Sequence, residues 1–271
     1  MAHTLLDSIR VAPGAPAELA DRDPRDKLGL AGKDEARAQV DELVTRLSQL
    51  QNRLWAEDRR SVLLVLQGLD ASGKDGTVRR IFTGLNPQGC AVTSFRAPTS
   101  NELDHDYLWR IHAACPTRGQ IGIFNRSHYE DIVTTRVLGL VDDATVRRRV
   151  EQINAFERTL AQEGTTVIKV FLNMSKEEQR LQLQERIDDP GKRWKMRMSD
   201  LETRKKWDEY RVAYDHALSA TSTRHAPWFV VPADRKWVRD VAVASLLVDA
   251  IERLDPQFPA PGEDLAGVVV E

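Results

Sequence analysis

A glycine-rich turn that carries a lysine follows a short apolar run, in the segment SVLLVLQGLDASGKDG of residues 61–76. The run at 61–67 is too short and too rich in valine and leucine for a surface helix, so it predicts a buried parallel strand. Gly68 and Gly73 allow successive backbone N–H groups to curl around an anion, beside the positive end of a helix expected to begin near Asp75. Lys74 adds a charge that can reach the anion. The segment therefore predicts a phosphate-binding loop.

The loop departs from the common pattern in the residue that follows the lysine. A P-loop usually has Ser or Thr there, and the hydroxyl holds Mg²⁺. This chain has Asp75 at that place and Thr77 two places further on. The strand, the glycines, the lysine and the helix nevertheless agree with one another. We expect the following residues to contact phosphate: Gly68, Ala71, Ser72, Gly73, Lys74, Asp75, Gly76 and Thr77.

Asp70 is unusual inside such a loop, because a carboxylate that faces a polyanion repels it unless a cation lies between them. Hard divalent cations prefer carboxylate oxygens as ligands. Asp70 is therefore a candidate metal ligand. The alternative is that its side chain only caps the turn, as aspartates often do.

A second polar cluster, in the segment GIFNRSHYEDI, lies where the third predicted strand ends. Ligands bind at the carboxyl ends of strands in open α/β sheets. In P-loop enzymes this strand commonly ends in an Asp that helps to hold Mg²⁺, but here Asn125 takes that place and carboxylates follow at Glu130 and Asp131. Arg126 is expected to clamp a phosphate. The alternative makes Asn125 a turn former and Arg126 an ion-pair partner of Glu130. His128 is expected to pack or to lie at the surface rather than to act as a base.

A basic hairpin is predicted after the fourth strand. Helix-start patterns of the form SxxE at 175–178 and 199–202 flank the segment DDPGKRWKM, in which proline and glycine interrupt the helices. Phosphoryl transfer requires cations that close over the transferring group and then release it, so the hairpin predicts a lid over the phosphate loop. The alternative is a solvated charged face. The basic residues near the tip are Arg186, Lys192, Arg193, Lys195 and Arg197.

These residues need a scaffold of alternating strands and helices to position them. The first thirty residues read as an extended arm, and apolar positions from Ala36 to Leu54 then step by three and four along a long helix that ends near Asp58. Strands are predicted at 61–67, 91–95, 120–124, 166–172 and 228–231, and helices at 101–114, 146–160 and 236–254. This alternation predicts an α/β fold with a doubly wound parallel sheet flanked by helices. We expect an N-terminal arm and long helix at 1–60 and a P-loop kinase core at 61–271, with the lid at about 175–222.

Composition excludes several classes of protein. The chain of 271 residues can bury one sizeable core, and its net charge of −2 argues against a general nucleic-acid binder. Cys90 and Cys115, its only cysteines, lack metal-ligand spacing and suit a reducing compartment. No apolar run reaches the about 20 residues that cross a bilayer, and the N-terminus lacks a signal-peptide pattern. We expect a cytoplasmic protein that binds neither membrane nor nucleic acid.

Four motifs in the same order, GLDASGKDG, FNRSHYED, DDPGKRWKM and ATSTRHAPWFVVPADRKW, resemble the polyphosphate kinase 2 family. The resemblance implies a thymidylate-kinase-like P-loop fold with a helical lid. It implies phosphoryl transfer between inorganic polyphosphate and nucleoside mono- and diphosphates, with Mg²⁺ as cofactor and Mn²⁺ as a substitute. Asn125 followed by Glu130 is similar to the class III branch, whose members phosphorylate both kinds of acceptor. The resemblance and the long helix both favour a homo-oligomer, a dimer or tetramer, although packing of that helix within the chain is the alternative.

The resemblance also assigns roles to residues, because Asp70, Lys74, Arg126 and the basic lid match positions at which the family handles phosphate and metal. The expected catalytic residues are Asp70, Lys74, Arg126 and Arg186; further phosphate or nucleotide contacts are Asn125, Lys192, Arg193 and Lys195; the metal ligands are Asp70 and Glu130, with Asn125 as an alternative. Two other functions stay open. One is an ATP-dependent nucleoside monophosphate kinase on the same fold, and the other is a non-catalytic module that binds nucleotides or polyanions.

Overall fold

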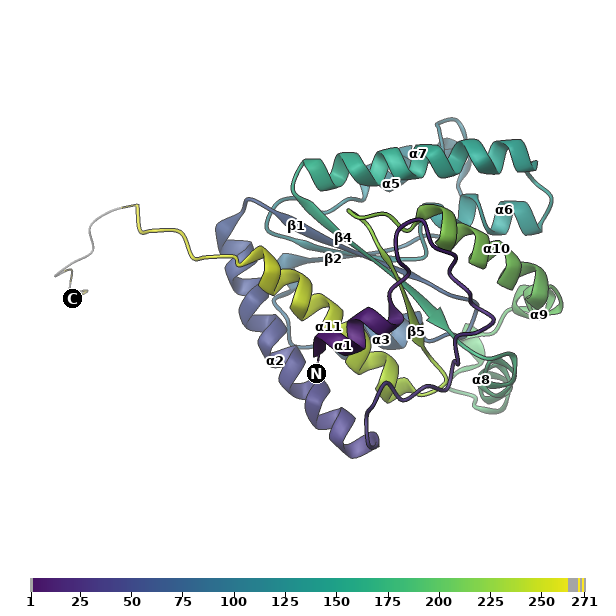
Figure 1. Cartoon of the computed structure of the whole chain (residues 1–271), viewed down its shortest axis with the longest axis horizontal. Helices are drawn as coiled ribbons and strands as arrows, with labels where there is room; N and C mark the ends of the chain where they lie inside the picture. The colour runs from purple at the N-terminus through teal and green to yellow at the C-terminus, as the bar shows by residue number, and fades with distance from the viewer. Residues whose placement is uncertain (1, 263–267, 269, 271) are drawn as a thin grey trace.

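The structure, a computed structural model, describes residues 2–262, 268 and 270 (Figure 1). Within these residues one parallel sheet has the strand order β2-β3-β1-β4-β5, which confirms the predicted doubly wound arrangement. The strands are β1 Ser61–Gln67, β2 Cys90–Ser94, β3 Ile121–Asn125, β4 Thr165–Asn173 and β5 Trp228–Pro232.

Helices cover both faces of the sheet, with α6, α7 and α10 on one face and α1, α2, α3 and α11 on the other (Figure 1). The α-helices are α1 Ala2–Ile9, α2 Lys33–Glu57, α3 Lys74–Phe82, α4 Ser100–Leu103, α5 Trp109–Ala113, α6 Thr134–Val137, α7 Asp143–Gln162, α8 Lys176–Asp188, α9 Met198–Lys205, α10 Trp207–Thr221 and α11 Lys236–Leu254. Short 3₁₀ helices are η1 Pro87–Gly89, η2 His128–Asp131 and η3 Arg193–Lys195.

The central strand β1 positions the phosphate loop. All of its residues are buried, and alternate side chains enter the two cores: Leu63 and Val65 on one face, Leu64 and Leu66 on the other. Strand β3 pairs with β1 up to the contact of Leu66 with Asn125. The residues after β1 and β3 therefore emerge side by side at the same edge of the sheet.

The apolar stripe of α2 packs within the chain. Leu47, Leu50 and Leu54 are buried in the core that α11 also enters, while Ala36 and Val40 contact the start of α11. The structure thus shows the intramolecular alternative for this helix. The expected dimer or tetramer stays a prediction that rests on the family resemblance.

Three details of the predicted elements are wrong. The N-terminal arm begins with helix α1, whose Leu6 and Ile9 are buried in the core between the sheet and α11. The helix predicted at 101–114 is two short helices, since Asp106 Oδ1 accepts a hydrogen bond from the Leu108 N–H at 2.9 Å and forms a turn there. Helix α9 begins at Met198 rather than after Ser199. No helix of the described residues combines the length and the apolar composition needed to cross a bilayer.

Candidate active site

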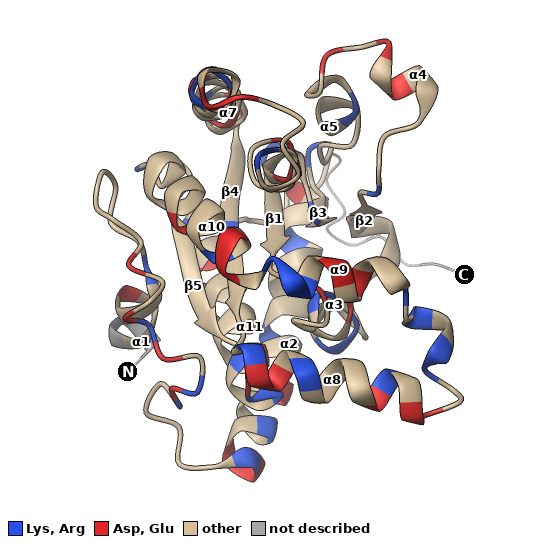
Figure 2. Ribbon diagram, turned by 90° about the vertical axis from the view of Figure 1, so that its right-hand side faces the viewer, with Lys and Arg blue, Asp and Glu red and all other residues tan. Residues whose placement is uncertain are grey.

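The phosphate loop joins β1 to α3 at the edge where the parallel strands end, and Figure 2 looks onto this edge with α3, α8, α9 and α10 around it. Two glycines have backbone conformations that L side chains rarely adopt, since φ is +147° at Gly68 and +96° at Gly73. A Cβ atom at Gly68 would also lie 2.8 Å from Ser72 Oγ and 3.0 Å from the Leu172 carbonyl oxygen. Both positions therefore require glycine.

Lys74 is the first residue of α3, and its side chain is folded into the loop with only 8% exposed. Its Nζ donates hydrogen bonds to the carbonyl oxygens of Gly68 at 2.6 Å and Leu69 at 3.2 Å. Burial, reinforced by the nearby Arg126 guanidinium, lowers the pKa of Lys74 from 10.5 to about 8. The loop thus holds a desolvated ammonium group whose charge a bound anion would stabilise.

The other residues predicted to contact phosphate lie in the loop or in the first turn of α3. Ala71 has a positive φ of +67°, and Ser72 is buried. The Thr77 hydroxyl donates to the Gly73 carbonyl oxygen at 3.2 Å, inside the helix. Thr77 therefore uses its hydroxyl locally, and it does not reproduce the Ser or Thr that follows the lysine in common P-loops.

Arg126 follows β3 and reaches across to the phosphate loop. Its Nη2 donates to Asp70 Oδ1 at 2.6 Å, and its φ of +64° turns the chain at this point. Burial disfavours the charged guanidinium, but the Glu130 and Asp70 carboxylates outweigh it, so the pKa of Arg126 lies above its usual value. The ion pair is with Asp70, whereas Glu130 accepts a hydrogen bond from the Thr134 hydroxyl at 2.6 Å. The expected alternative pairing of Arg126 with Glu130 is therefore not the one observed.

Asn125 connects the end of β3 to the start of α3. Its side-chain Nδ2 donates to Asp75 Oδ1 at 2.5 Å. Asp75 occupies the place where a P-loop usually has its metal-binding hydroxyl, so this contact joins the two positions at which the chain departs from the common pattern.

The metal ligands expected from the sequence are two carboxylates, Asp70 and Glu130. Both carboxylates favour the protonated forms of Arg126 and Lys74, so the four side chains form one electrostatic cluster. In the part of the chain that the structure describes, no group of three or more His, Cys, Asp or Glu side chains is arranged to hold a metal. Mg²⁺ commonly uses only one or two carboxylates and completes its shell with phosphate oxygens and water. The two carboxylates therefore fit Mg²⁺ bound together with a substrate phosphate.

The predicted lid contributes Arg186 to this cluster. Arg186 Nη1 lies 3.3 Å from Asp200 Oδ2, which joins α8 to α9. Burial and the Asp70 carboxylate raise the pKa of Asp200, so this pair lies beside the phosphate loop. Asp200 also accepts from the Arg197 N–H at 3.4 Å, which explains why α9 begins earlier than predicted. In addition, Gln179 Nε2 of α8 donates to the Asp70 carbonyl oxygen at 3.0 Å.

The cations at the tip of the hairpin are held apart from the cluster. Lys192 forms ion pairs with Glu185 at 2.6 Å and Asp189 at 3.2 Å. Arg193 Nε donates to the Ile187 carbonyl oxygen at 2.8 Å, and Lys195 Nζ lies 5.1 Å from the centroid of the neighbouring tryptophan ring. These contacts are local to the tip. Their predicted role in binding phosphate therefore depends on movement of the hairpin.

A buried polar cluster behind the third-strand loop was missed by the sequence analysis. Lys169 Nζ of β4 donates to Glu157 Oε2 at 2.6 Å, to Tyr129 Oη at 2.8 Å and to the Thr221 carbonyl oxygen at 2.7 Å. His128 Nε2 lies 3.3 Å from Glu157 Oε1. Lys169 and Glu157 are both essentially unexposed. The cluster fixes the chain directly after Arg126, and His128 is a packing residue, as expected.

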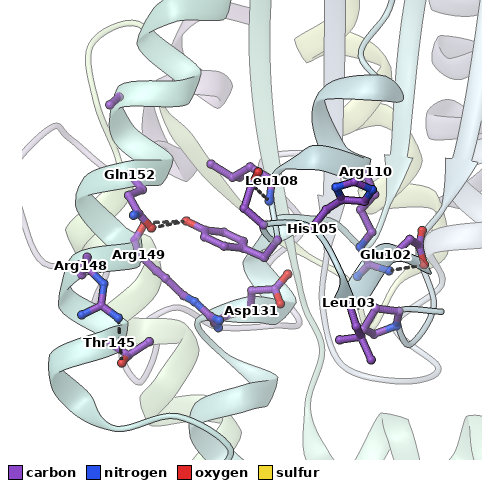
Figure 3. A pocket seen from close by; sticks show the side chains of 14 residues that line it. Glu102, Leu103, His105, Leu108, Arg110, Asp131, Thr145, Arg148, Arg149 and Gln152 are labelled. Atoms are coloured by element: carbon purple, nitrogen blue, oxygen red, sulfur yellow. Dashed lines mark hydrogen bonds and ion pairs between the residues drawn. The ribbon is translucent and has the colours of Figure 1, made fainter. Parts of the chain in front are cut away.

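A cavity of about 700 Å³ lies between the segment 98–110 and α7 (Figure 3). Arg149 Nη1 donates to the Asp131 carbonyl oxygen at 2.7 Å, and its guanidinium lies over the Tyr107 ring. Burial raises the pKa of Asp131 against the opposing effects of Arg149 and Arg110. Because Asp131 directly follows Glu130 in η2, the cavity is next to the phosphate cluster. It offers space, three carboxyl groups (Glu102, Asp106 and Asp131) and three guanidinium groups (Arg110, Arg148 and Arg149) to a ligand held there.

Comparison with known proteins gives consistent matches along the chain. Residues 31–259 match the family described as polyphosphate kinase 2. The chain is 48% identical to the AMP/ADP-polyphosphate phosphotransferase of Meiothermus ruber, over 98% of this chain and 100% of that protein. It is 42% identical to the ADP-polyphosphate phosphotransferase of Rhodopseudomonas palustris, over 80% of this chain and 79% of that protein. The crystal structure of polyphosphate kinase 2 from Arthrobacter aurescens TC1 has a TM-score of 0.93 and 42% identity, over 97% of this chain and 94% of that one.

Proposed function

The chain belongs to the polyphosphate kinase 2 family, and from this membership and the site we propose that it transfers phosphoryl groups between inorganic polyphosphate and AMP or ADP. GMP and GDP are included as acceptors. The observation that carries the proposal is the convergence of Lys74 and Arg126 with the Asp70 carboxylate at the ends of β1 and β3.

Charge compensation is the main task of this site. A nucleotide phosphate oxygen is already an ionised nucleophile, so the reaction needs neither a general base nor a covalent intermediate on the protein. Two polyanions must instead be aligned while their repulsion is reduced. Lys74 binds the phosphoryl group in the loop. Arg126 gives up its ion pair with Asp70 and then binds both the donor phosphate and the acceptor phosphate. Arg186 reaches the same group from the lid.

Mg²⁺ is the proposed cofactor, with Mn²⁺ as a substitute, and Asp70 and Glu130 are the residues that would hold it. When bound, the ion supplies positive charge between the carboxylates and the phosphates. This explains how a carboxylate can lie within a phosphate loop. Arg126 pairs with Asp70 at 2.6 Å here and would be available for phosphate once another cation balanced the Asp70 charge.

The acceptor nucleoside is proposed to enter the cavity beside Asp131 (Figure 3). Glu130 belongs to the phosphate cluster, and the next residue, Asp131, belongs to the cavity. A nucleotide that extends from Glu130 to Asp131 would place its phosphates at Arg126 and its nucleoside beside the stacked pair of Tyr107 and Arg149. Within the predicted lid at about 175–222, α10 packs into the core of the sheet layer. The rest of that segment, α8 with η3 and α9, is proposed to close over the phosphates through Lys192, Arg193 and Lys195.

One assay tests donor and acceptor together. Purified protein is incubated with Mg²⁺, with each of AMP, ADP, GMP and GDP, and with either polyphosphate or ATP as donor, and the products are resolved by ion-exchange chromatography. We expect ADP and ATP from the adenine acceptors. If AMP is phosphorylated from ATP but never from polyphosphate, the protein is instead an ATP-dependent monophosphate kinase. Light scattering during size-exclusion chromatography tests the proposed dimer or tetramer.

A further inference from the structure

Arg239, on α11, packs against the phosphate loop and was not among the residues predicted from the sequence. A Cβ atom added to Gly73 would lie 1.9 Å from Arg239 Nη1, and one added to Gly76 would lie 3.6 Å from its Nη2. The guanidinium therefore covers the start of α3 at close contact. Its side chain is only 4% exposed.

The hydrogen bonds of Arg239 leave one end of the guanidinium free. Nε and Nη2 donate to Asp240 Oδ1 at 3.0 and 2.8 Å. Among the described residues, Nη1 donates to no acceptor, although it is the atom that faces Gly73. Nη1 is not fully buried, so a ligand can reach it, and an anion next to Gly73 would accept a charge-assisted hydrogen bond from it.

Arg239 and Arg126 approach the loop from different parts of the fold. Arg126 follows β3, which lies on one side of β1 in the sheet, whereas α11 follows β5 on the other side. Lys236, one turn before Arg239, lies within electrostatic range of Asp240 and of Glu185 on α8. Cations thus continue from the phosphate loop toward the start of α11 and the lid, away from the cavity beside Asp131.

We propose that Arg239 binds the donor phosphate next to the one held by Lys74, so that the polyphosphate chain runs from Lys74 toward the start of α11. This inference rests on the proposed function. In this arrangement Arg239 touches the donor only. The bound polyphosphate also has a direction, with the acceptor on the Arg126 side and the rest of the donor on the Arg239 side. Lys236 then meets phosphates further along the chain.

A structural role of Arg239 is the alternative, in which the guanidinium serves only to neutralise the buried Asp240. The two roles predict different results for Asp240→Asn. If Arg239 binds the donor, removing the Asp240 charge frees the guanidinium and lowers the KM for polyphosphate. If the pair is purely structural, the same substitution changes thermal stability and leaves that KM unaltered.

The test compares Arg239→Gln, Asp240→Asn and the double variant with Arg253→Gln, which removes an exposed ion-paired arginine from the same helix. The KM for polyphosphate, the KM for ADP and the thermal midpoint are measured for each. We expect Arg239→Gln to raise the polyphosphate KM about tenfold or more, with the ADP KM within about twofold. The double variant should recover thermal stability but not the polyphosphate KM, and Arg253→Gln should leave both KM values unchanged.

The inference is overturned if the double variant recovers the polyphosphate KM together with stability, or if Arg239→Gln raises both KM values equally. If Arg239→Gln does not fold, the polyphosphate KM of Asp240→Asn and of the double variant decides the question. Absence of any transfer from polyphosphate by the unsubstituted protein would overturn the proposed function itself. An active enzyme whose KM for polyphosphate is unchanged by Arg239→Gln would overturn only the inference about Arg239.

Discussion

The buried Lys74 predicts a specific dependence of donor binding on pH. Its pKa is lowered from 10.5 to about 8, chiefly by burial, which corresponds to about 3 kcal/mol of disfavoured charge in the free protein. A bound polyphosphate compensates that charge and raises the pKa again. At pH 8 about half of the free molecules carry the proton, so binding should take up about half a proton at this residue. At pH 9 only about a tenth carry it, and kcat/KM should be about fivefold lower than at pH 8.

The assay is titration calorimetry with tripolyphosphate at pH 8, in two buffers of different ionisation enthalpy, which yields the number of protons taken up. Lys74→Met is the control, because it keeps the length of the side chain and removes the titrating group. We expect proton uptake in the unsubstituted protein to exceed that in Lys74→Met by about half a proton. Equal uptake in the two proteins, or a kcat/KM that stays level from pH 7 to 10, would refute the reasoning.

The same pKa has a consequence for folding. The unfolded lysine has a pKa near 10.5 and the folded one about 8, so the unfolded state binds more protons between these values. The buried charge of Lys74 therefore lowers the free energy of unfolding by its full amount below pH 8. This loss shrinks as the pH rises from 8 toward 10.5. In Lys74→Met this rise in the free energy of unfolding should be absent.

The remaining predictions concern the metal site, the buried cluster and the loop glycine. Asp70→Asn should lower kcat about a hundredfold and raise the Mg²⁺ concentration needed, while Glu130→Gln should weaken the Mg²⁺ response more than the thermal midpoint; near-normal kinetics in folded Asp70→Asn would remove it from the metal site. Glu157→Gln and Lys169→Met should each reduce the free energy of unfolding by about 3–5 kcal/mol, because each leaves a buried charge unpaired; a urea titration that shows a loss below about 1 kcal/mol would contradict this. Gly73→Ala should abolish tripolyphosphate binding, since φ is +96° and the Cβ meets Arg239, whereas Gly84→Ala, with φ of +95° and open space, should show only the backbone penalty of about 1–2 kcal/mol. Similar binding by both glycine variants would mean that the contact with Arg239 is unimportant.

Local patterns were sufficient to predict the phosphate loop and the sheet. The apolar run before Gly68 and the polar residues after β3 each lie in one continuous segment, and parallel strands must end at the same edge. For the same reason the sequence placed Asp70, Lys74 and Arg126 together. Their roles in catalysis and metal binding stay predictions, as does the division of the chain into arm, core and lid.

The features that the sequence did not predict depend on contacts between distant segments. Arg239 lies next to Asp240 in helix α11, where the two read as an ordinary pair of opposite charges, and only packing of α11 on α3 brings Arg239 to Gly73. Glu157 and Lys169 lie on a helix and the following strand, and Glu157 looks like an ordinary surface charge among the charged residues of α7. A lysine inside the apolar run of β4 is the one signal that could have indicated a buried partner.

The most direct test of the proposed function is a ³¹P NMR time course of the protein with Mg²⁺, polyphosphate and ADP. We predict that the β- and γ-phosphate signals of ATP grow as the internal polyphosphate signal declines, while the terminal polyphosphate signal keeps its intensity and no orthophosphate is released. Lys74→Met should lower this rate by about a hundredfold or more. Release of orthophosphate in place of ATP, or unchanged spectra with the folded protein, would contradict direct phosphoryl transfer at this site.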